Sequence, residues 1–147
     1  MSGPDDRLAV IDGMLAAPFP ETETGTGGQG WSGPGYHWRV LKAGRDFWDD
    51  RSEEVVEAAE EEIEAAHDAL VTALRERWGE PREVDLTPFT MGEAPSREPQ
   101  DLLSAHTSGM LVWPRPDGRW LAIATGQADA EFPIMLLAAV GEGAVEA

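Results

Sequence analysis

The sequence predicts an α+β fold: one domain over residues 1–147, in which a mostly antiparallel sheet of about four to five strands packs on one long amphipathic helix, with a short N-terminal helix beside it. Three observations predict this fold. Segment 52–78 has the periodicity of a long helix. A Pro-Asp-Gly turn at 116–118 joins two strand-like segments. A chain of 147 residues suffices for one core but not comfortably for two. Most predicted strands follow the long helix, which favours helices segregated to one face of the sheet.

The chain is expected to begin with a helix and a loop. Residues 5–17 predict a short amphipathic helix, because their apolar positions recur at helical spacing. The residues that share this face are Leu8, Ile11, Met14 and Leu15. Residues 18–35 then predict a Gly-rich loop, since no periodicity is visible there.

A strand and the long helix come next. Residues 36–43 alternate in the manner of a strand. In the helix 52–78, Val56, Ile63 and Leu70 fall on one apolar stripe at about 100° per residue. Asp50 or Ser52 can cap its start, and Gly79 suits the left-handed position that follows its end.

The remaining segments predict further strands. Residues 83–89 form one strand, and 108–140 a β-meander. Its last segment, 132–140, reads either as a strand or as a helix with Pro133 at its first position, and the strand is favoured. Trp113 and Trp120 are expected to face each other across the hairpin.

The chain is strongly acidic. It has 28 acidic residues against 11 basic ones, a formal net charge of −17. Between residues 46 and 68 the only basic residue is Arg51. Such a chain repels nucleic-acid phosphates and anionic membranes, so we expect neither as a direct partner. The acidic helix is either a solvated face that keeps the protein soluble or a docking surface for a cationic partner.

Other features of composition bear on localisation. The sequence has no cysteine, no run of 18 apolar residues, and no secretory signal at its start. We therefore expect a cytoplasmic protein without disulfides or thiolate metal sites. Arginine greatly outnumbers lysine, and Ala and Gly are abundant, which indicates a GC-rich, bacterial coding sequence.

Three motifs resemble catalytic or metal sites but lack the necessary context. Glu64 and His67 have the spacing of a di-iron ligand pair, but only one copy is present. Segment 25–30 resembles a phosphate loop, yet no strand precedes it and no helix follows. Ser32 lies in a near match to G-x-S-x-G, in which Pro34 replaces the last glycine. We therefore expect no catalytic residue, no metal and no cofactor.

The six tryptophans divide into two groups. Those on predicted strands or at the helix end are expected in the core or at its edge: Trp38, Trp78, Trp113 and Trp120. Trp31 and Trp48 lie in predicted loops and are candidates for partner contact.

The sequence favours a small acidic protein-binding module, similar to immunity proteins, chaperones or adaptors, that docks a basic protein through its acidic helix. The candidate contact residues are Trp31, Trp48, Asp49, Asp50, Glu53, Glu57, Glu60, Glu61 and Glu64. One alternative is a nucleic-acid mimic, whose carboxylates stand in for phosphates. Another is an enzyme with a site near the Gly-rich loop that uses His37 or His106. The acidic face disfavours self-association through that face, so we expect a monomer, or a weak homodimer formed through a sheet edge or the C-terminal apolar strand.

Overall fold

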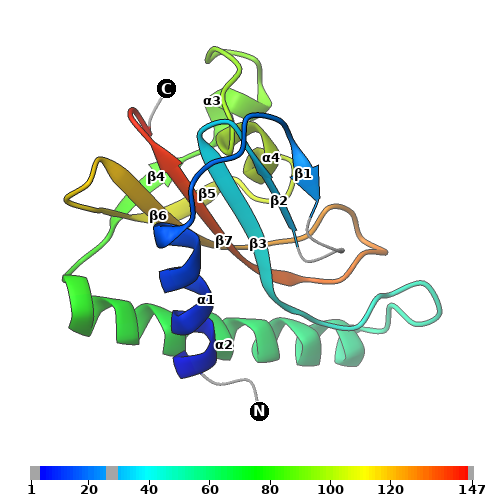
Figure 1. The fold of residues 1–147 in the computed structure, drawn as a ribbon. Helices are drawn as coiled ribbons and strands as arrows, with labels where there is room; N and C mark the ends of the chain where they lie inside the picture. The colour runs from blue at the N-terminus through cyan, green and yellow to red at the C-terminus, as the bar shows by residue number, and fades with distance from the viewer. Residues whose placement is uncertain (1–3, 26–29, 146–147) are drawn as a thin grey trace.

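One antiparallel sheet forms the centre of the protein (Figure 1) in the computed structural model, which describes residues 4–25 and 30–145. Its seven strands within these residues pair in the order β1-β2-β3-β7-β6-β5-β4. The strands are β1 (Thr24–Gly25), β2 (Gly30–Gly33), β3 (Tyr36–Ala43), β4 (Arg82–Asp85), β5 (Gly109–Pro114), β6 (Arg119–Gly126) and β7 (Met135–Glu142). The helices in the same part of the chain are α1 (Pro4–Ala16), α2 (Glu53–Trp78), α3 (Thr87–Thr90) and α4 (Gln100–Ser104). The predicted α+β class is confirmed, but the sheet has more strands than the four to five expected.

The additional strands come from the segment predicted as a loop, 18–35. β1 pairs with β2, where Thr24 lies opposite Ser32, and β2 in turn pairs with β3. The loop prediction is wrong at these positions because glycines interrupt the alternation of side chains by which a strand is recognised. Residues 26–29, which belong to the phosphate-loop-like motif, lie outside the described residues.

The long helix forms as predicted, and α2 crosses one face of the sheet next to α1 (Figure 1). Its buried stripe consists of Ala59, Ile63, Leu70, Val71 and Leu74. Most of this stripe packs with inward-facing residues of β6 and β7, such as Ile123 and Leu136. Gly79 takes φ 88° and donates its N–H to the Arg75 carbonyl, which ends the helix. At the other end, the Asp50 carboxylate accepts the N–H of Ser52 at 2.8 Å, while the Ser52 side chain makes no capping bond.

Short helices cover the opposite face, so the expectation of helices on one face only is wrong. Leu86, Phe89 and Leu103, from the segment that contains α3 and α4, pack on Trp38 and other residues of the sheet. The strand predicted over 83–89 ends at β4, because Pro88 lies in the first turn of α3, and a proline cannot donate to a strand ladder.

The predicted meander is confirmed as β5, β6 and β7, and the segment 132–140 contributes the strand rather than the alternative helix. The two indoles of the β5–β6 hairpin do not face each other, however. Trp113 lies opposite Leu121, whereas Trp120 lies opposite Pro114. Because a shift of one residue reverses the face, Trp113 joins the core under α2 and Trp120 joins the core under α3 and α4.

Candidate protein-interaction surface

The acidic residues predicted to bind a partner lie on the solvent side of α2. Glu53, Glu57, Glu60, Glu61 and Glu64 are all exposed. The sheet holds the opposite side of the helix, since the apolar stripe is buried against it. The ion pairs on this helix use other acidic residues: Glu62 pairs with Lys42, and Glu80, just beyond the helix, pairs with Arg75. The five carboxylates are therefore presented to solvent from one rigid element.

The loop before α2 places three of the predicted contact residues next to the start of the helix. Trp48, Asp49 and Asp50 are exposed. The hydrogen bond from the Ser52 N–H holds the pKa of the Asp50 carboxyl below its ordinary value, so this group stays charged. The acidic surface of the helix is thereby continued onto the preceding loop.

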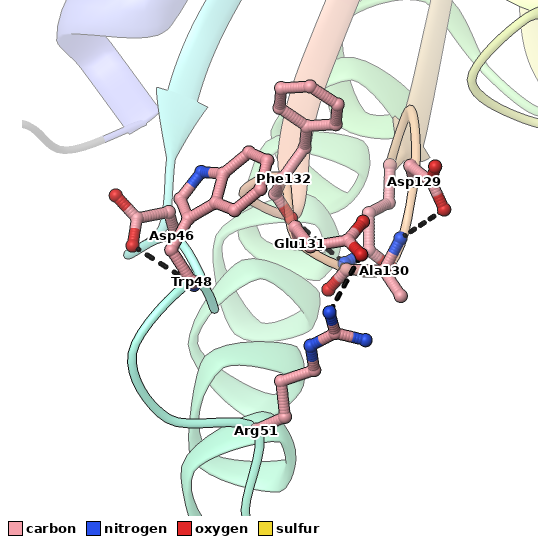
Figure 2. Close-up of polar contacts among 8 residues, drawn as sticks. Asp46, Trp48, Arg51, Asp129, Ala130, Glu131 and Phe132 are labelled. Carbon is pink, nitrogen blue, oxygen red and sulfur yellow. Dashed lines mark hydrogen bonds and ion pairs between the residues drawn. The ribbon is translucent and has the colours of Figure 1, made fainter.

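Trp48 does not stand alone, because Phe132 lies beside it (Figure 2). The ring centroids are 5.6 Å apart in an edge-to-face arrangement with an interplanar angle of 83°. Trp48 is 62% exposed and Phe132 is 43% exposed, so the pair leaves much of its apolar area in water. Aromatic residues are enriched at protein interfaces, and tryptophan is enriched among the residues that contribute most to binding. We refer to Trp48 and Phe132 as the aromatic pair.

Two loops that are far apart in the sequence are bonded together around the aromatic pair. The Phe47 N–H donates to the Glu131 carbonyl at 2.9 Å, and the Phe47 ring is fully buried. The Arg51 guanidinium donates to the Glu131 carboxylate at 2.7 Å, as Figure 2 shows. The Gln127 amide donates to the Phe132 carbonyl at 2.9 Å. These bonds hold the rings in place before any partner arrives, which lowers the entropy cost of binding.

The structure separates Trp31 from the other predicted contact residues. Trp31 lies in β2 directly opposite Trp38 of β3, so both side chains are on the same face of the sheet. Trp38 belongs to the core beneath α3 and α4, whereas α2 covers the other face. Although Trp31 is 49% exposed, it cannot share one contact surface with the acidic side of α2.

Sequence reasoning missed Phe132 as a surface residue. The sequence predicts Phe132 at the start of a strand, yet β7 begins only at Met135 and the Phe132 side chain is exposed. No local pattern marks Phe132 as a partner of Trp48, because their proximity depends on the pairing of β3 with β7.

A buried polar cluster surrounds Ser32, the residue in the near match to G-x-S-x-G. Ser32 Oγ lies 2.6 Å from Nδ1 of His37, and His37 Nε2 lies 3.1 Å from the Ala17 carbonyl. A carbonyl only accepts, so Nε2 carries the proton and Nδ1 accepts the Ser32 hydroxyl hydrogen. Arg39 donates to the Ser32 oxygen at 3.2 and 3.3 Å. Ser32 and His37 are both buried.

The same burial favours the neutral form of His37. Desolvation lowers its pKa, and the nearby Arg39 and Arg119 cations add to that effect. His106 is not available to this cluster: it contacts the Trp38 ring on the face that α3 and α4 cover, whereas His37 Nε2 bonds the carbonyl of Ala17, just after α1. The structure thus places the two histidines suggested for an enzyme on opposite faces of the sheet.

In the described part of the chain, no hydrogen bond joins Glu64 and His67, the two residues with the spacing of a di-iron ligand pair. His67 Nδ1 instead lies 3.3 Å from the neighbouring Asp68 carboxylate.

Within residues 4–25 and 30–145, the helices are all too short or too polar to cross a membrane.

Comparison with known proteins gives no relative for this chain. No protein-family model, curated protein or solved structure matches it.

Proposed function

We propose that this protein is a small, acidic, cytoplasmic protein-binding module of a bacterial cell, which docks a basic partner protein. The contact surface comprises the exposed carboxylates of α2, Asp49 and Asp50, and the aromatic pair. The observation that carries the proposal is the position of the aromatic pair, exposed and braced, next to the start of the acidic helix. A role similar to that of an immunity protein, chaperone or adaptor suits such a surface.

The two parts of the surface contribute differently to binding. The carboxylates from Glu53 to Glu64 extend over about 17 Å of helix and attract a cationic partner over about a Debye length. Their attraction raises the rate of association, and it weakens as the salt concentration increases. The aromatic pair loses its contact with water when the partner covers it, and this burial slows dissociation.

The test is capture of partners from a lysate of the source organism at low and high salt. We compare the wild type with Glu53→Gln/Glu57→Gln/Glu61→Gln, with Trp48→Ala, and with a control that removes three exposed charges outside α2, Glu21→Gln/Glu93→Gln/Glu142→Gln. We expect a basic protein that the wild type and the control retain at low salt. The helix variant should lose it, and Trp48→Ala should weaken its binding by roughly tenfold or more.

Two results would count against this function. A partner that binds all four proteins equally would show that the surface is not used. Capture of a nucleic-acid-binding protein that is displaced by a DNA duplex would favour mimicry of phosphates, in which carboxylates occupy a basic groove.

A further inference from the structure

A groove runs between α2 and the β4–β5 side of the sheet. α2 packs mainly on β6, β7 and β3. Of the residues of β5 on this face, Trp113 is buried in the core under α2, whereas Leu111 is only partly buried. The space there has a volume of about 610 Å³ and lies between His67 of α2 and residues of β4, β5 and β6. A second hollow of about 360 Å³ adjoins it along α2 and shares His67 and Thr125 with it. Each is within the range of about 300–1,000 Å³ that is typical of binding pockets.

The walls of the groove are acidic and its floor is apolar. The α2 wall presents Glu60, Glu64 and Asp68. The β4 wall presents Glu83 and Asp85, whose side chains share a face because they are two residues apart in a strand. The apolar floor consists of Leu111, Ile123 and Ile134. Among the lining side chains of the two hollows, only His67 can carry a positive charge.

This combination fits one kind of occupant. We infer that the groove holds an extended basic segment of the partner protein, an inference that rests on the proposed function. Successive side chains of an extended chain point to opposite sides, so neighbouring Lys or Arg residues reach both the α2 wall and the β4 wall. An apolar residue elsewhere in the segment can cover Leu111. A second copy of this chain fits poorly, since its net charge of −17 would meet carboxylates on both walls.

The groove also extends the surface described above with residues that were not predicted. Glu83 and Asp85 lie outside the acidic segment 46–68 and face α2 only because β4 occupies the edge of the sheet. Hydrogen bonding by the Thr87 side chain, and by the Thr87 N–H at 2.9 Å, lowers the pKa of the Asp85 carboxyl, so Asp85 is ionised at neutral pH.

The experiment measures binding of a fluorescein-labelled peptide of about nine residues, made of Lys and Arg around a central Leu, to the full chain at low salt. Fluorescence anisotropy gives Kd, and amide NMR shifts locate the peptide. The groove variant Asp68→Asn/Glu83→Gln removes one charge from each wall. The matched control, Glu93→Gln/Glu142→Gln, removes two exposed charges that do not line the groove.

We expect shifts at His67, Leu111 and Thr125, and a Kd that rises about three- to tenfold in the groove variant but less than twofold in the control. Equal weakening in both variants, shifts confined to the outer side of α2, or no binding to the wild type would each overturn the groove site. Failure of the groove site can be distinguished from failure of the proposed function. If the helix variant loses the captured partner while Asp68→Asn/Glu83→Gln retains it fully, docking stands and the groove does not contribute.

Discussion

At the scale of single residues, the cluster of Ser32, His37 and Arg39 shows how a motif with catalytic appearance serves the fold. Each hydrogen-bonding group has a partner: the serine hydroxyl donates to the imidazole and accepts from the guanidinium, and the imidazole donates to Ala17. The bonds join β2, β3 and Ala17, the residue directly after α1. A buried polar cluster of this kind stabilises one arrangement of these elements, because any other arrangement leaves polar groups unpaired.

We therefore expect Ser32→Ala to destabilise the protein by about 1–3 kcal/mol, since it leaves the imidazole nitrogen without its donor and removes an acceptor of Arg39. Urea denaturation gives the free energy of unfolding. Thr72→Ala, on the exposed side of α2, is the control and should change it by no more than about 0.5 kcal/mol. An unchanged stability of Ser32→Ala would show that the cluster is not structural.

At the scale of secondary-structure elements, two glycines illustrate how the same residue type has opposite roles. Gly13 lies within α1, and a Cβ added there would meet no atom within 4 Å. Gly141 lies in β7 beneath Trp120, and a Cβ added there would collide with Cζ2 of the indole. The first glycine only weakens a helix, whereas the second makes room for a core tryptophan.

Gly13→Ala should accordingly stabilise the protein by about 0.5–1 kcal/mol, because alanine has the higher helix propensity. Gly141→Ala should destabilise it by about 1–3 kcal/mol, because the indole must shift in a packed core. Thermal and urea unfolding of the two variants provide the measurement, and each variant is the control for the other. A destabilising Gly13→Ala would contradict the helical assignment of this segment.

At the scale of the whole molecule, the net charge of −17 acts against the compact state. The salt bridges within the described residues, such as Lys42 with Glu62, neutralise few of the acidic groups and are mostly exposed. Like charges on α2 repel one another and the rest of the surface. Retention of so many unpaired carboxylates on one helix opposes stability, which is consistent with a use for them in binding.

Salt should therefore stabilise the protein. Between about 10 mM and about 300 mM NaCl, screening weakens the repulsion, and we expect Tm to rise by roughly 2–4 °C, equivalent to about 1 kcal/mol. Differential scanning calorimetry measures the change. In Glu53→Gln/Glu57→Gln/Glu61→Gln the rise should be smaller, because part of the repulsion is already removed. A Tm that falls with salt would mean that attractive ion pairs dominate the surface.

Local signals predicted the elements whose physical causes are local. The helix 53–78 follows from its own apolar stripe and from Gly79, and the β5–β6 hairpin follows from the turn at Gly118, which takes φ 86°. β3 spans the predicted residues 36–43. β1 and β2 escaped prediction because a Gly-rich segment carries little pattern of its own and is held as strands by β3.

The sequence by itself determined the class of fold, the long helix and its acidic solvent side, since periodicity and charge are properties of neighbouring residues. Only the tertiary structure decided the position of β7 beside β3, and this pairing brings Phe132 to Trp48. The tertiary structure also placed Trp31 on the face of the sheet that α2 does not cover, and it set Glu83 opposite α2. These contacts join residues that are distant in the chain. They depend on strand order and register, which the packing of the whole sheet determines rather than any single segment.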